Sequence, residues 1–375
     1  MSPSITQITP TQPAPFDGAA LRRTADDLWE AVSCGDEHAA YGVVLDAHDA
    51  GADHEALLLD VIGAVQRRVG QEWADNRMSV AREHAATAIN DRVIAALSVR
   101  HMPSPTGKRR GRVTVACVDG EWHALPARLL AEVLRLRGWH VDYLGAQVPT
   151  AHLIGHVHRT GPDHVALSSS LATRLPTAHA TVTACQAIGV PVLAGGAAFG
   201  TDGRYARLLG ADAWAPDARA AADLLALRPP TRPLTGHQPI EDLPHLADQE
   251  YTMVSRDSGR LVRAALAGLE ERFPAMRSYT EQQRQHTAED LGHIVDFLAV
   301  ALYTDCDRLF TDFLTWTAGI LTARSVPAAS LPPALEVLGT QLTDFPRASR
   351  LLDHALQALN DPDVPAARSG SGVSR

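Results

Sequence analysis

The sequence is poor in cysteine, in aromatic residues and in long apolar runs. Its four cysteines stand far apart, at positions 34, 117, 185 and 306, so neither a disulfide framework nor a zinc ribbon is expected. No apolar run approaches the length of a membrane span, and the first residues lack the basic and apolar segments of a secretory leader. These absences favour a cytoplasmic protein.

An excess of basic residues is also missing. The net charge of -9 and the pI near 6.0 argue against nucleic acid or an anionic membrane as a partner. The densest basic stretch, residues 108–112, has the character of a solvated linker. With 375 residues, 45% of them hydrophobic and 21% charged, the chain is typical of a soluble protein of two or three domains.

The spacing of apolar residues divides the chain into three blocks. Residues 18–100 and 246–360 show helical spacing and predict a four-helix-bundle domain and an all-α domain, while residues 111–228 alternate between strand and helix patterns. The alternation predicts a doubly wound, flavodoxin-like (Rossmann-type) parallel sheet. Its expected strands cover residues 113–118, 139–144, 164–168, 190–194 and 211–215. Residues 1–17 and 361–375 are expected to be disordered tails.

A carboxylate and a histidine follow the first expected strand. Glu121 and His123 lie in the loop between that strand and a helix predicted over residues 125–138. Ligands of such sheets bind at the carboxyl ends of the strands. Glu121 can hold one ring nitrogen of His123 and leave the other for a metal. A surface histidine beside an acidic residue would give the same sequence pattern. This pair alone therefore does not distinguish a metal ligand from a surface histidine.

Two further motifs fall on the same edge of the predicted sheet. Ser169-Ser170-Leu171 follows the third strand and Gly195-Gly196 follows the fourth. Small residues at these positions let a large, flat ligand approach the backbone closely. The edge is therefore a candidate cofactor site.

Carboxylate-x-His, Ser-x-Leu and Gly-Gly in one such unit resemble the cobalamin-binding domain of methionine synthases, mutases and corrinoid proteins. The resemblance implies that His123 is the lower axial cobalt ligand and that Glu121 holds it. Ser169, Ser170 and the glycine pair would line the channel for the nucleotide tail of the cofactor. One departure is Pro126, where the family has a glycine three residues after the histidine, and this can change the path of the loop.

The helical block in front of the sheet carries Trp73, Glu83 and His84. Their Trp-x9-Glu-His spacing resembles the helical cap of light-sensing cobalamin repressors, as does Trp122 in the Gly-Glu-Trp-His stretch. The resemblance implies adenosylcobalamin, with its 5′-deoxyadenosyl group against the indole of Trp73 and the carboxylate of Glu83. His84 becomes a candidate upper cobalt ligand after photolysis, because Ala74 stands where the repressors have a histidine. The alternative is that Trp73 and His84 only pack a helical bundle.

Those repressors carry a helix-turn-helix segment in front of the cap. In this acidic sequence a polar tail stands there instead, so direct binding of nucleic acid is not expected.

The last block contains Arg277, Arg284, His286, Asp290 and His293, the last three spaced to share one helix face. Aromatic residues follow, namely Tyr303, Phe310, Phe313 and Trp316. An apolar groove lined by these aromatic residues, with two histidines, an acid and arginines, suits a flat tetrapyrrole with propionates. The block resembles the globin-like domain of photocobilins, which implies noncovalent biliverdin beside the cobalamin. A plain helical dimerisation domain with solvated histidines is the alternative.

The chain is thus expected to be a light sensor, not an enzyme, that binds adenosylcobalamin and biliverdin. It would signal through a light-dependent homo-oligomer or a partner protein. Three other functions stay open. One is a corrinoid methyl carrier of a methyltransferase system, which shares His123, Ser169 and the glycine pair but does not need Trp73 with Glu83. Another is a dark regulator that responds to haem or redox state. The third, a plain cobalamin reservoir, fits the sequence least economically.

Overall fold

The computed structural model describes residues 17–100, 110–231 and 243–360. The predicted tails at residues 1–16 and 361–375 lie outside the described residues. Contacts divide the chain into two units, and each is described by itself. The first comprises the described residues of Met1–Val69 and Val80–Met102, and the second those of Gly70–Ser79 and Pro103–Arg375.

The first unit is a helical bundle, as predicted. Its helices are α1 (Gly18–Cys34), α2 (Glu37–Asp49), the short α3 (His54–Ala56), α4 (Gly63–Ala74, whose last residues belong to the second unit) and α5 (Val80–Arg100). A π-helical turn, η1 (Leu57–Ile62), joins α3 to α4. Asp17, Asp36 and Asp53 cap α1, α2 and α3 through their side chains. Leu28, Leu57 and Leu97 are fully buried where the helices meet.

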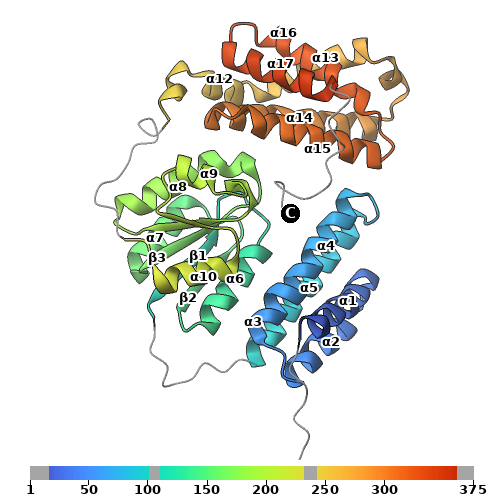
Figure 1. Cartoon of the computed structure of the whole chain (residues 1–375). Coiled ribbons are helices and arrows are strands. Elements are labelled where there is room, and N and C mark those ends of the chain that lie inside the picture. The colour runs from blue at the N-terminus through green and yellow to red at the C-terminus, as the bar shows by residue number, and fades with distance from the viewer. Residues whose placement is uncertain (1–16, 101–109, 232–242, 361–375) are drawn as a thin grey trace, which may run out of the picture. The chain divides into compact units, whose positions relative to one another are not determined.

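A five-stranded parallel sheet forms the centre of the second unit (Figure 1). The strands are β1 (Arg112–Cys117), β2 (His140–Gly145), β3 (His164–Ser168), β4 (Val192–Gly195) and β5 (Ala213–Ala215), in the order β2-β1-β3-β4-β5. This confirms the flavodoxin-like prediction, including all five strands. The order places the carboxyl ends of β1, β3 and β4 side by side.

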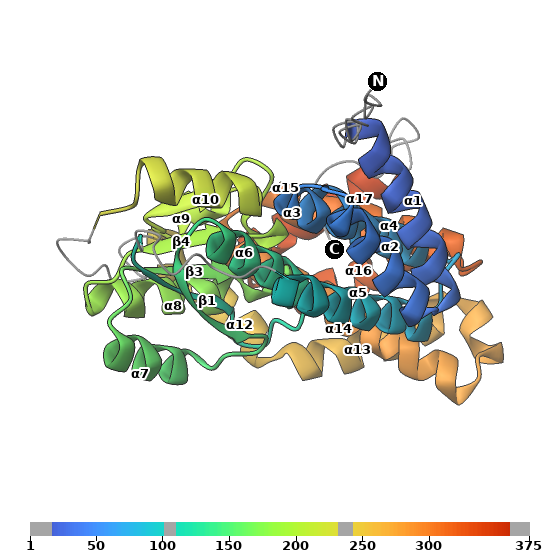
Figure 2. The same cartoon turned by 90° about the horizontal axis from the view of Figure 1, so that it is seen from below.

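Helices cover both faces of this sheet (Figure 2). One face carries α6 (Leu125–Leu136) and α10 (Ala218–Leu227), and the other carries α7 (Thr150–Thr160) and α8 (Leu175–Ala187). Because both faces are covered, β1 and β3 are buried almost throughout, whereas β2, at the edge of the sheet, is only partly buried. The short α9 (Arg204–Leu208) was not predicted, because five residues do not establish a helical period.

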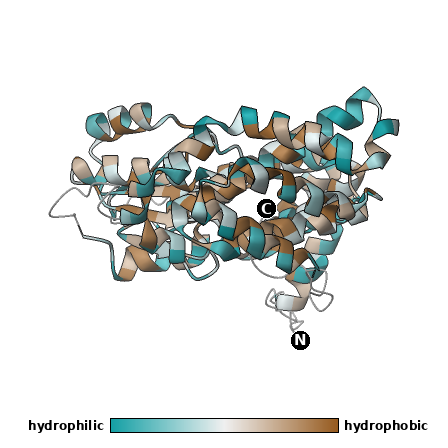
Figure 3. Cartoon of the chain, turned by 90° about the horizontal axis from the view of Figure 1, so that it is seen from above, coloured by the Kyte–Doolittle hydropathy of each residue, from teal (hydrophilic) through white to brown (hydrophobic). Residues whose placement is uncertain are grey.

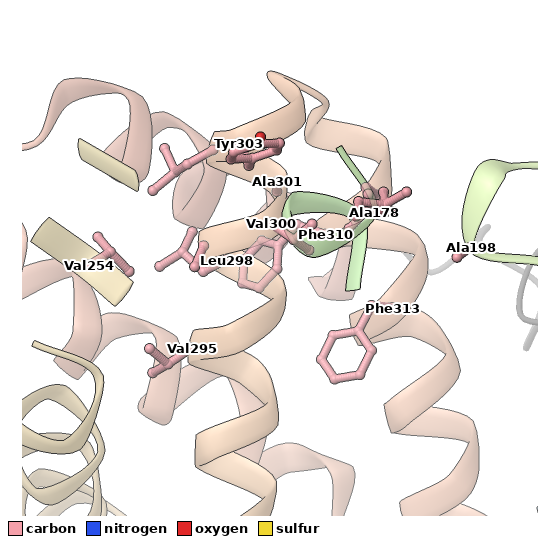
Figure 4. Packing of buried hydrophobic residues seen from close by; sticks show 14 of the residues in the cluster. Ala178, Ala198, Val254, Val295, Leu298, Val300, Ala301, Tyr303, Phe310 and Phe313 are labelled. Carbon is pink, nitrogen blue, oxygen red and sulfur yellow. The ribbon is translucent and has the colours of Figure 1, made fainter. Parts of the chain in front are cut away.

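The C-terminal block is helical, as predicted. It contains α12 (Glu250–Arg256), α13 (Ser258–Arg272), α14 (Glu281–Thr304), α15 (Asp307–Ala323), α16 (Leu331–Gln341) and α17 (Pro346–Asn360). Apolar and polar residues alternate around the helices of the chain, as Figure 3 shows, which is typical of amphipathic helices. Figure 4 shows Leu298, Val300 and Phe310 among the buried residues that these helices contribute.

The C-terminal helices and the sheet domain share one continuous core. His179 of α8 is fully buried, and its Nδ1 lies 2.8 Å from the hydroxyl of Tyr303 in α14. Tyr205 of α9 donates a hydrogen bond to the sulfur of Cys306 at 3.2 Å. Among the described residues, no helix is both long enough and apolar enough to cross a membrane.

Candidate functional site

The loop after β1 begins with a tight turn. The backbone amide of Glu121 donates to the carbonyl of Val118 at 2.9 Å, and Gly120 adopts a φ of +77° in that turn. A Cβ at Gly120 would lie only 2.9 Å from Nη1 of Arg174. The glycine therefore provides both the positive φ and the space that the turn requires.

Glu121 is the centre of the site and is fully buried. Its Oε1 accepts hydrogen bonds from the backbone amide of His123 at 2.9 Å and lies 2.6 Å from Nδ1 of the same residue. Its Oε2 accepts from the hydroxyl of Ser169 at 3.1 Å and from the amides of Ser170 at 2.7 Å and Leu171 at 2.9 Å. One carboxylate thus ties the loop after β1 to the loop after β3.

These contacts keep Glu121 ionised. Burial alone would raise its pKa, but the hydrogen bonds from the His123 side chain and from the amides of His123 and Leu171 lower the pKa to about 2. At neutral pH the carboxylate can only accept hydrogen bonds. Nδ1 of His123 therefore donates to this carboxylate, and Nε2 faces the indole N–H of Trp122, which can only donate and so requires a lone pair there.

His123 presents Nε2 away from Glu121. Its side chain is 31% exposed, whereas that of Glu121 is inaccessible. The indole Nε1 of Trp122 donates to Nε2 at 3.2 Å. A lone imidazole does not hold a free metal ion firmly, but it can complete the coordination of a metal that brings its own macrocycle. The fixed tautomer suits that chemistry.

The glycine pair after β4 lets the backbone of Ser169 come close. Gly196 has a φ of +97°, and a Cβ there would lie 2.3 Å from the carbonyl oxygen of Ser169. The amide of Ser169 donates to Gly195 at 3.1 Å, and that of Ala198 donates to Ser169 at the same distance. The predicted Ser-x-Leu and Gly-Gly motifs therefore meet at the sheet edge beside Glu121.

Pro126 fits this loop because it occupies the first turn of α6, where a missing amide proton and a fixed φ are tolerated. The departure from the family pattern thus starts a helix and leaves Glu121 and His123 in place. Beneath the loop, burial raises the pKa of the Cys117 thiol to about 12. That thiol is protonated at neutral pH and packs as a small apolar group.

Two residues that contribute to the loop were not predicted from the sequence. The amide of Gln147, after β2, donates to the carbonyl of Glu121 at 2.9 Å, and Gln147 itself has a φ of +51°. Arg174 packs against Gly120, and its buried Nε has no hydrogen-bond partner. Neither residue belongs to a motif. The position of Arg174, three residues after Leu171, was the one feature of the sequence that could have pointed to its place beside this loop.

The predicted cap residues lie at the ends of two helices. Trp73 is in the last turn of α4, and Glu83 and His84 are in the first turn of α5. Glu83 accepts from the hydroxyl of Thr87 at 2.9 Å and lies 2.6 Å from Nδ1 of His84. His84 is 75% exposed in its side chain, so it does not pack inside the bundle as the alternative interpretation required. Its role as a ligand stays a prediction.

The predicted bilin residues lie around the start of α14. Arg277, His286, Asp290 and His293 are exposed, the last three on α14, while Arg284 pairs with Glu270. His286 lies 3.3 Å from Glu289. The aromatic residues that were expected to line a groove are instead packed: Phe310 and Tyr303 are buried, and Phe313 stacks on Phe297 with ring centres 3.7 Å apart. Bilin binding stays a prediction.

Comparison with known proteins agrees with this geometry. Residues 111–225 match the model of the B12 binding domain, and residues 24–98 match a second model that is also described as a B12 binding domain. The two matches cover the sheet domain and most of the helical bundle, and they support cobalamin binding.

Two curated relatives are transcriptional repressors of Myxococcus xanthus. The chain is 32% identical to the HTH-type transcriptional repressor CarA over 184 residues, which is 48% of this chain and 59% of that protein. It is 33% identical to the HTH-type transcriptional repressor CarH over 145 residues, or 37% of this chain and 46% of that protein. The chain therefore spans about half the length of these relatives.

Among solved structures, the monomethylamine corrinoid protein of Methanosarcina barkeri is similar, with 18% identity and a TM-score of 0.48. The match covers 54% of this chain and 97% of that one.

Proposed function

We propose that this protein is a light sensor that binds adenosylcobalamin with Nε2 of His123 as the lower cobalt ligand. The observation that carries the proposal is the pairing of a fully buried, ionised Glu121 with Nδ1 of His123 at 2.6 Å. This pairing fixes the tautomer whose Nε2 can bind a metal and raises the basicity of that nitrogen. Gly196 and Ser169 supply the close backbone approach that a large cofactor needs.

Bound adenosylcobalamin supplies a cobalt–carbon bond that light can break. The resemblance to light-sensing cobalamin repressors favours this cofactor form, and the cap residues have suitable chemistry. Trp73 offers a rigid apolar wall, and Glu83 offers a carboxylate for a ribose diol. Trp73 and Glu83 would contact the adenosyl group in the dark, and loss of that group in the light would let the helices that carry them repack.

The C-terminal helices are proposed to bind biliverdin noncovalently and to extend absorption to red light. Because the aromatic core there is tightly packed, the exposed face of α14 with His286, Asp290 and His293 is the proposed binding surface. Arg277 would pair with a propionate of the bilin. Arg284 would break its ion pair with Glu270 and pair with a propionate instead.

Output is proposed to pass through an oligomer or a protein partner rather than through catalysis. The sequence identity with two transcriptional repressors supports a regulatory role rather than an enzymatic one. The continuous core between the sheet domain and the C-terminal helices, with the His179–Tyr303 contact, supports transmission within the second unit.

The decisive test is an absorption spectrum of the full chain with adenosylcobalamin, recorded before and after green light. We expect an irreversible change of the cobalamin bands. His123→Ala should abolish the histidine-bound spectrum, and His158→Ala, which changes an exposed histidine of α7, should leave it intact. A light-stable spectrum, with methylcobalamin bound as well as adenosylcobalamin, would favour the methyl-carrier function instead.

Biliverdin is tested separately with the same chain. We expect a red absorption band that weakens when His286 and His293 are both changed to Ala. His354→Ala is the control, because His354 is exposed and lies 2.6 Å from Asp307 at another part of the C-terminal block. Absence of a red band contradicts the bilin proposal and leaves the cobalamin proposal unaffected.

A further inference from the structure

We infer that Trp122 blocks the metal-binding nitrogen of His123. Its indole N–H donates a hydrogen bond to Nε2 before the cofactor binds, and this bond must break for cobalt to bind. This inference rests on the proposed function, since it concerns how the same histidine is loaded. It assigns Trp122 the role of a residue that sets the rate and affinity of cofactor uptake.

The hydrogen-bonding roles around His123 leave one arrangement. The indole N–H of Trp122 donates and cannot accept, and it lies 3.2 Å from Nε2. Nε2 therefore presents a lone pair to the indole. Nδ1 carries the ring proton of this tautomer and donates it to Oε1 of Glu121, 2.6 Å away. In both contacts of the His123 ring a donor faces an acceptor. Nε2, the atom that would bind cobalt, is the acceptor of the indole N–H.

The ring geometry indicates a directed contact rather than stacking. The centres of the Trp122 and His123 rings are 5.5 Å apart, and the ring planes are inclined by 42°. The two residues are neighbours in the chain, so the loop that aims His123 also holds the indole beside it. The contact therefore forms without help from any other element.

The side chain of Trp122 also lies mostly at the surface. It is 55% exposed, unlike most large apolar residues described in the structure, and Trp139, for comparison, is 8% exposed. Turning the Trp122 side chain away costs little packing. The free-energy cost that Trp122 adds to cofactor binding is then mainly the loss of one neutral hydrogen bond, which corresponds to a change in affinity of about two- to tenfold.

The hydrogen bond itself can be tested by NMR on the full chain without added cofactor. Trp122→Phe assigns one of the six indole N–H signals, and Trp316→Phe removes another as a control. We expect His123→Ala to shift the Trp122 signal upfield, as loss of an acceptor requires, and His158→Ala to leave it unchanged. An unmoved signal in His123→Ala overturns the inference.

Loading is tested by mixing the chain with adenosylcobalamin in the dark and following the absorption change. Trp122→Phe keeps an aromatic ring but has no donor, and it should bind faster and about two- to tenfold more tightly than the original chain. Equal or weaker binding by Trp122→Phe overturns the inference, because the indole would then be a cofactor contact or a bystander. If neither protein binds cobalamin, the proposed function fails, while the NMR result still reports on the Trp122–His123 bond.

Discussion

Glu121 and Ser170 lie 49 residues apart in the chain, yet the carboxylate of one accepts a 2.7 Å hydrogen bond from the backbone amide of the other. Because the same carboxylate holds Nδ1 of His123, the orientation of the histidine depends on the loops after both β1 and β3. A change in the conformation of either loop should therefore alter the position of Nε2 of His123.

Replacing Glu121 with Gln should destabilise the sheet domain. The amide group places donors where the backbone amides and the hydroxyl of Ser169 already donate, so buried groups lose their acceptor. We expect a loss of about 2–3 kcal/mol in the free energy of unfolding. Chemical denaturation measures it, with Glu271→Gln as the control because Glu271 is exposed. Equal midpoints for the two variants would show that Glu121 is not a structural acceptor.

The stability that Glu121 contributes should disappear in acid. Its pKa is about 2 in the folded chain against an ordinary 4.5, so the contribution is fully present above pH 4.5 and declines as the pH falls towards 2. The full shift corresponds to about 3 kcal/mol. Denaturation of the original chain and of Glu121→Gln should give free energies that converge over this range. A constant difference between them would contradict the depressed pKa.

Gly196→Ala should disrupt the sheet edge. The new Cβ would meet the carbonyl oxygen of Ser169 at 2.3 Å, in a backbone conformation that already disfavours a side chain. Gly189→Ala is a matched control, because Gly189 has a φ of +74° but nothing within 4 Å of its Cβ position. We expect Gly189→Ala to cost about 1 kcal/mol and Gly196→Ala distinctly more, with weakened cobalamin binding. Similar melting temperatures for the two variants would refute the steric argument.

Tyr303→Phe should loosen the C-terminal helices from the sheet domain. The change removes the hydroxyl that lies 2.8 Å from Nδ1 of the buried His179 and leaves the ring in place. The expected cost is about 1–2 kcal/mol in the free energy of unfolding, together with faster hydrogen exchange in α8 and α14. Tyr279→Phe, in a half-buried tyrosine before α14, serves as the control. Unchanged exchange in both helices would mean that this contact does not join the two parts.

The sequence was sufficient to predict the sheet, because buried parallel strands are continuous apolar runs and their order follows from the doubly wound pattern. It also located Glu121, His123, Ser169 and Gly196, since each follows a strand end. The contact of Arg174 with Gly120 could not be predicted, because it depends on how two loops fold over one another.

Periodicity misled the prediction at the C-terminal block. It identified the helices but could not show that Phe313 stacks on Phe297, so the aromatic residues were expected to line a groove. Helical spacing alone does not distinguish a packed core from a binding surface.

The π-helical turn η1 has a consequence for the register of the bundle. A turn that holds one residue more than an α-helical turn shifts every later side chain by about 100° around the helix axis. Gln66, just after η1, donates to the hydroxyl of Thr87 at 2.7 Å and accepts from the amide of Asn90 at 2.8 Å, both on α5. Deleting a single residue from Leu57–Ile62 would rotate Gln66 out of reach of both partners. The number of residues in this turn, rather than their chemistry, thus determines which face of α4 meets α5.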